Sequence, residues 1–74
     1  MPYPTNSDLP PPVQRVLPEH AQDIYRAAFN HAYERFAGDE DRARRIAWGA
    51  VKRRYVKVGG AWVEIGGPSP VPRP

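Results

Sequence analysis

The stretch PEHAQDIYRAAFNHAYERFAG, residues 18–38, decides the fold, because its apolar residues recur with the period of an α-helix. The apolar positions fall on a single helical stripe: Ala21, Ile24, Tyr25, Ala28, Phe29, Ala32, Tyr33 and Phe36. Pro18 suits a first helical turn, and Gly38 suits a left-handed stop. The pattern predicts a helix over residues 18–37, with Arg26 and Asn30 on its polar side. The aromatic rings could alternatively stack on bases, but helical spacing is more typical of a core.

The following segment predicts a second amphipathic helix over residues 40–56. Asp39 can accept the cap hydrogen bond, and the acids of residues 40 and 41 suit a helix start. Small alanines on one side would let this helix pack closely against the first, antiparallel or at a steep angle. Gly49 inside the helix costs about 1 kcal/mol relative to Ala, which would be compatible with a close backbone contact. We expect the core to consist of Leu17, Ile24, Tyr25, Ala28, Phe29, Ala32, Phe36, Ile46, Ala47, Ala50, Val51 and Tyr55.

Shorter elements flank the two helices. Proline is tolerated in a first helical turn, which predicts a short helix near residues 11–16. The alternation of AWVEI at 61–65 predicts a strand, pairing either with 55–58 as a hairpin or with the segment around Tyr3. The predicted fold is therefore mainly α, an α+β domain over residues 1–65 with a small two-stranded β element near Trp62. Residues 66–74, rich in Pro and Gly, are predicted to be a disordered tail.

Composition narrows the class of protein. A chain of 74 residues has room for one small domain, and the absence of Cys excludes disulfides and thiolate zinc sites. No apolar run approaches the roughly 18 residues that span a bilayer, and the N-terminus lacks the features of a signal peptide. We expect a cytoplasmic protein without a membrane span.

Charge is divided sharply along the chain. Residues 1–41 hold three bases and seven acids, whereas residues 42–74 hold eight bases and one acid. On a helical wheel the candidate residues for an anionic partner are Arg42, Arg45, Lys52 and Arg53, with Lys57 nearer the apolar boundary. This face is either a solvated surface or a binding face for phosphate or carboxylate groups.

Catalytic and metal-binding motifs are absent from the sequence. Ser7 and Ser69 both lie in proline-rich ends, so no nucleophile and base share a rigid element. His20 and Asp23 are close along the first helix, but His31 lies on another side, and three converging ligands are needed for a metal. We therefore expect no enzyme activity, no cofactor and no metal.

Two blocks in order carry a resemblance to a known family: the opening MPY, SDLP and LPEHAQDIYRAAFNHAYERF, and then AWGAVKRRYVK. Over residues 1–65 the chain resembles the ChaB family of cation transport regulators. The resemblance implies a few helices with a small sheet, in a cyclin-box-like arrangement, and a role in regulating a Na⁺/Ca²⁺–proton antiporter. The family has no agreed catalytic or ligand-binding residues, so none is transferred.

Two functions remain open at this point. The first is a non-enzymatic regulatory adaptor that docks its basic helix face on another protein, which the resemblance implies is the antiporter. The alternative is a module that binds nucleic acid without sequence specificity. The basic face lacks Ser, Thr, Asn and Gln, which disfavours the reading of base edges.

Overall fold

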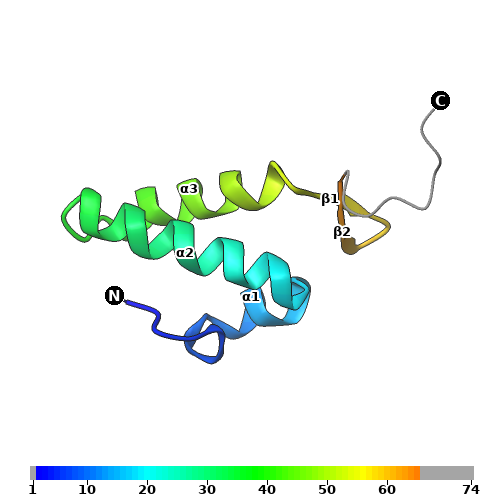
Figure 1. Cartoon of the computed structure of the whole chain (residues 1–74), viewed down its shortest axis with the longest axis horizontal. Helices are drawn as coiled ribbons and strands as arrows, with labels where there is room; N and C mark the ends of the chain where they lie inside the picture. The colour runs from blue at the N-terminus through cyan, green and yellow to red at the C-terminus, as the bar shows by residue number, and fades with distance from the viewer. Residues whose placement is uncertain (1, 66–74) are drawn as a thin grey trace.

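Three α-helices and a β-hairpin make up residues 2–65, the part of the chain that the computed structural model describes (Figure 1). The helices are the 3₁₀ helix η1 (Asn6–Asp8) and the α-helices α1 (Pro11–Val16), α2 (Glu19–Arg35) and α3 (Glu40–Lys52). The strands of the hairpin are β1 (Tyr55–Val58) and β2 (Ala61–Glu64). The prediction of a mainly α fold with a small β element is confirmed. The predicted disordered tail, residues 66–74, lies outside the described residues.

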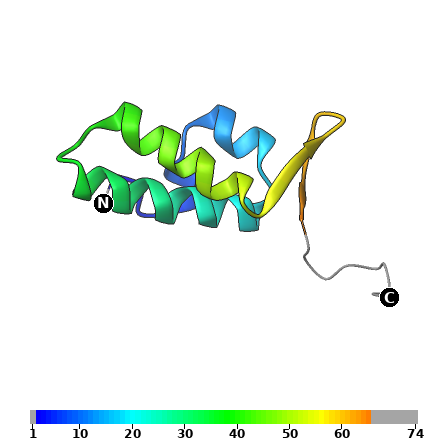
Figure 2. The ribbon, with the colours of Figure 1, turned by 90° about the horizontal axis from the view of Figure 1, so that it is seen from above.

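Helices α2 and α3 lie side by side and antiparallel, as both views show (Figures 1 and 2). Small side chains allow this packing: Ala21, Ala32, Ala43 and Ala47 are at most 1% exposed. Helix α2 ends in a Schellman motif, in which the Gly38 N–H donates to the Tyr33 carbonyl at 2.8 Å. Ala37, with φ 55°, takes the left-handed position that the sequence suggested for Gly38, and Gly38 at φ 82° follows it. The side chain of Asp39 then caps α3 by accepting from the Arg42 N–H.

The core extends further toward the N-terminus than predicted. Leu9 and Val13 are buried although the predicted core did not include them, because η1 and α1 pack against α2. The prediction for Ile46 is wrong: its side chain is 39% exposed. It lies at the edge of the apolar stripe of α3, about 100° around the helix from the buried Ala47. Four other predicted core residues are only partly buried: Ile24, Ala28, Phe36 and Ala50.

Helix α3 is shorter than the helix predicted over residues 40–56. It ends at Lys52 instead of residue 56, and Tyr55–Val58 form β1. Tyr and Val favour a strand, and the following Gly59 and Gly60 both have positive φ, as a two-residue type I′ turn requires. The resulting antiparallel hairpin pairs Tyr55 with Glu64 and Val58 with Ala61. Of the two pairings left open by the sequence, the hairpin is therefore the one that forms.

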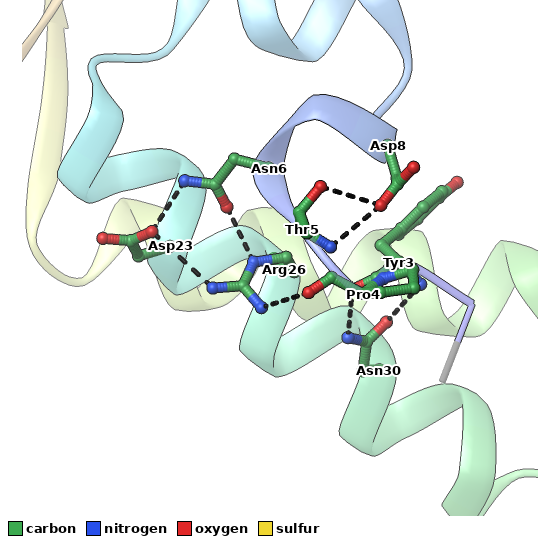
Figure 3. Close-up of polar contacts among 8 residues, drawn as sticks. All are labelled: Tyr3, Pro4, Thr5, Asn6, Asp8, Asp23, Arg26 and Asn30. Atoms are coloured by element: carbon green, nitrogen blue, oxygen red, sulfur yellow. Dashed lines mark hydrogen bonds and ion pairs between the residues drawn. The ribbon is translucent and has the colours of Figure 1, made fainter.

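The segment around Tyr3 is held by a side chain instead of a strand (Figure 3). The Tyr3 N–H donates to Asn30 Oδ1 at 3.1 Å, and Asn30 Nδ2 donates to the Tyr3 carbonyl at 2.8 Å. The assignment of Asn30 to the polar side of α2 is wrong, since only 8% of the residue is exposed. The Tyr3 ring lies 4.8 Å from the ring of Phe29. The beginning of the chain thus packs on the middle of α2.

Arg26 makes a second attachment for the N-terminal segment. Its Nε donates to Asn6 Oδ1 at 2.7 Å and its Nη1 to the Pro4 carbonyl at 3.2 Å. Asn6 Nδ2 in turn donates to Asp23 Oδ1 at 2.7 Å (Figure 3). The part of α2 around Asp23, Arg26 and Asn30 is consequently in contact with the chain's own first residues.

Candidate docking surface

The cationic side of α3 faces solvent. Arg42, Arg45 and Lys52 lie on α3 and Arg53 is its C-cap residue, and all four are exposed. Successive residues of an α-helix are about 100° apart, so these four positions share one side with Gly49 between them. A Cβ built on Gly49 would have no atom within 4 Å. The close backbone contact considered for Gly49 is therefore not made, and the glycine leaves an open spot among the four bases.

The domain's own carboxylates do not neutralise most of this surface. Arg42 is held at the α2–α3 turn, where its guanidinium lies 4.6 Å from the centre of the Phe36 ring. In residues 2–65, no ion pair or side-chain hydrogen bond involves Arg45, Lys52 or Arg53. The carboxylate of Asp41 pairs at 3.2 Å with Arg44, which leaves the helix about 100° away from Arg45. The positive charge is thus free to meet an external anion.

Lys57 is separated from the other candidates. The structure places it on β1, exposed and opposite Trp62 in the hairpin register. The helix ends before it is reached, so Lys57 extends the positive region onto the hairpin and is not part of the helical face. We call Arg42, Arg45, Lys52 and Arg53 the cationic face.

The aromatic residues form a row through the molecule and not a surface platform. Tyr25 and Phe29 are buried, with ring centres 6.1 Å apart. Trp48 meets Tyr25 edge-on at 5.3 Å, and Trp62 lies 5.7 Å from Trp48. Burial raises the pKa of Tyr25, as it does the pKa of Tyr55. Because they are buried, Tyr25 and Phe29 cannot stack on the bases of a nucleic acid.

A groove of about 390 Å³ lies on another flank, between α1 and α3. It is lined by Pro10, Pro12, Val13, Val16, Tyr25, Arg44 and Trp48. No local pattern in the sequence indicates this groove, because its lining comes from α1, α2 and α3, which meet only in the folded chain. Val16, one of its lining residues on α1, remains 46% exposed, and the sequence alone shows only that this residue is aliphatic.

The remaining polar candidates do not converge. Among residues 2–65, no three His, Asp or Glu side chains come together as a metal site would require. His20 packs its ring 6.3 Å from the ring of Tyr55. Within the same described range, no helix combines the length and apolar character needed to cross a membrane.

Comparison with known proteins gives a consistent result. The family model ChaB matches residues 9–64. Proteins named "Putative cation transport regulator ChaB" from Escherichia coli K12 and Shigella flexneri are 50% identical over 66 residues, covering 77% of this chain and 87% of theirs. The solved structure described as "NMR solution structure of the putative cation transport regulator ChaB" has a TM-score of 0.78 and 43% identity, and the match covers 88% of this chain and 100% of the other. With a family model that matches residues 9–64 and this level of identity over most of both chains, the chain belongs to the ChaB family.

Proposed function

We propose that this protein is a non-enzymatic regulator of cation transport that docks its cationic face on an acidic cytosolic segment of a cation–proton antiporter. The relatives are named as cation transport regulators. The resemblance described above points to an antiporter that moves Na⁺ or Ca²⁺ in exchange for protons. The protein would act at the cytoplasmic side of the membrane that holds this transporter.

The observation that carries the proposal is the set of exposed bases without acidic partners. Arg45, Lys52 and Arg53 lie on one side of α3, and no carboxylate of residues 2–65 pairs with them. An arginine fork can hold two carboxylate oxygens at once. Complementary charge across an interface mainly sets the rate of encounter and the register of the partners. The open spot at Gly49 would let a partner's backbone approach the helix between the bases.

Charge reversal tests this docking mode. Arg45→Glu/Lys52→Glu should weaken binding to peptides from the acidic cytosolic segments of the antiporter by about tenfold or more, since two attractive contacts become repulsive. Titration calorimetry or fluorescence anisotropy would measure the dissociation constant. The matched control is Arg15→Glu/Arg35→Glu, which changes the net charge equally on exposed residues of α1 and α2. Equal losses for the two variants would show that net charge alone matters and would remove the cationic face from the mechanism.

A salt titration with duplex DNA separates this function from the nucleic-acid alternative. A phosphate-binding face with three to five contacts would give a log–log slope of roughly −3 to −4. The adaptor function predicts little DNA binding at physiological salt, while binding to the peptide persists. Steep, salt-dependent DNA binding without affinity for any peptide would favour the alternative.

A further inference from the structure

The hairpin has one face made only of apolar side chains. Side chains alternate across a strand, and the register pairs Val56 with Val63 and Val58 with Ala61. These four residues therefore share a side, and Ile65, two residues beyond Val63, continues it. We call Val56, Val58, Ala61, Val63 and Ile65 the outer hairpin face.

This outer hairpin face is exposed although it is apolar. The exposed fractions are 44% for Val56, 58% for Val58, 47% for Val63 and 51% for Ile65. The opposite side of the hairpin is the one that packs, through Tyr55 on His20 and Trp62 on Trp48. An antiparallel sheet with one packed face normally turns polar side chains to the solvent. Here the solvent side of residues 55–65 carries none.

Basic residues flank the outer hairpin face. Lys52, Arg53 and Arg54 precede β1, and Lys57, between Val56 and Val58 in the sequence, projects from the other side of the strand beside Trp62. All four are exposed, and no ion pair within residues 2–65 holds them. The segment 52–65 has a single acid, Glu64. Long Lys and Arg side chains can lie along an apolar surface while their charged ends reach an anion beside it.

We propose that the outer hairpin face binds the surface of a lipid bilayer that contains anionic lipids. The aliphatic side chains enter the boundary between headgroups and acyl chains, and the neighbouring bases contact the lipid phosphates and carboxylates. Binding of this kind scales with buried apolar area plus attraction to anionic lipid. Each Lys or Arg near such a surface strengthens binding by about fivefold.

The charge and the size of this face favour a bilayer over a protein partner. A second copy would bring together two sets of the three bases that precede β1, which is unfavourable. Four half-exposed aliphatic side chains and one alanine also cover only part of the roughly 800 Å² that each partner buries in a standard protein complex. A bilayer requires no matching shape, and it offers apolar depth and negative charge at the same place.

Vesicle sedimentation with the full chain tests the proposal. The chain should bind vesicles of phosphatidylcholine with phosphatidylserine at least tenfold more tightly than pure phosphatidylcholine, in line with several bases at the surface. The triple variant Val56→Thr/Val58→Thr/Val63→Thr keeps the shape and strand preference of the side chains but removes apolar surface. It should bind the anionic vesicles about tenfold more weakly. The control, Val16→Thr, alters an exposed aliphatic residue of α1 and should bind like the unchanged chain.

Hydrogen exchange on the vesicles gives a second readout that does not depend on a variant folding. Amides of residues 55–65 should become protected, while those of α1 stay unchanged. Vesicle binding that the triple variant retains in full, or protection confined to α1, would overturn the proposal. Concentration-dependent self-association abolished by the triple variant, without vesicle binding, would instead assign the face to a second copy. Because Arg45 lies away from the hairpin, loss of peptide binding in Arg45→Glu with intact vesicle binding would concern the cationic face alone.

Discussion

Asn30 shows how a single buried amide can hold a backbone segment that is distant in the sequence. Its side chain supplies one acceptor and one donor to the backbone of Tyr3, 27 residues away. Helical periodicity assigned Asn30 to the solvent because an amide counts as polar. Burial is tolerated here because both ends of the amide have partners. Such pairing depends on a contact distant in sequence, so no local pattern could have predicted it.

Asn30→Ala should lower the free energy of unfolding by about 1–2 kcal/mol, because the Tyr3 N–H and C=O lose their partners. Urea denaturation followed by circular dichroism would measure it. His31→Ala is the matched control, since it places alanine at the next, exposed position of α2 and should change stability by less than about 0.5 kcal/mol. Equal values for the two variants would contradict a stabilising role for the amide.

Tyr25 should make stability depend on alkaline pH. Burial raises its pKa above the usual value of 10.0, so the folded state keeps the phenol proton at a pH where the unfolded chain releases it. The stabilising contribution is complete below about pH 10 and is lost as the pH rises toward the folded pKa. Urea midpoints between about pH 8 and 11 should fall less steeply for Tyr25→Phe than for the unchanged chain. Parallel curves would be inconsistent with a buried phenol.

At the scale of elements, α2 was the most predictable, because its apolar stripe continues over five turns between clear end signals. The end of α3 was not, since Lys52, Arg53 and Arg54 are compatible with a helix and only Tyr55–Val58 favour a strand. The apolar stripe of α3 extends to Tyr55, so its periodicity alone could not separate a longer helix from a helix followed by a buried strand residue. Pairing with Ala61–Glu64 resolves this choice in the folded chain.

Gly49→Ala should stabilise α3 by about 1 kcal/mol, because alanine is the better helix former and the added Cβ meets no atom within 4 Å. For a domain of this size the melting temperature should rise by roughly 4–8 °C. The control Gly38→Ala should do the opposite, since Gly38 has φ +82° and its Cβ would lie 3.5 Å from the Tyr33 ring. A stabilised Gly49→Ala variant with weaker peptide binding would support the partner's approach at this position, whereas a destabilised one would indicate a contact that the structure does not contain.

At the scale of the whole molecule, a row of aromatic rings runs from the N-terminal segment across α2 and α3 to the hairpin. The row passes through Tyr3, Phe29, Tyr25, Trp48 and Trp62. The sequence identified the aromatic residues as structural but could not give their order, which depends on how three segments meet. The bases of the cationic face were likewise predictable from helical spacing, whereas the exposed aliphatic side of the hairpin required the register.

Trp48→Ala should destabilise the domain more than Trp62→Ala. Trp48 contacts both Tyr25 and Trp62, so its removal opens the row at the junction of helices and hairpin and should cost about 2–4 kcal/mol. Trp62 contacts the row at its end, and its removal should release the hairpin while leaving the helical signal in circular dichroism unchanged. Urea denaturation of both variants measures the difference. Equal costs would place the two rings in the same cooperative unit with the same burial.

The pairing of Tyr3 with Asn30 also has a consequence for the order of assembly on the ribosome. It joins two points within the first 30 residues and needs no part of α3. Chains emerge with the N-terminus first, so this contact can close before the arginine-rich helix has emerged. In the acidic first half of the nascent chain, the N-terminal segment would then already pack on α2. The side of α2 that carries the small alanines would remain exposed until α3 packs against it.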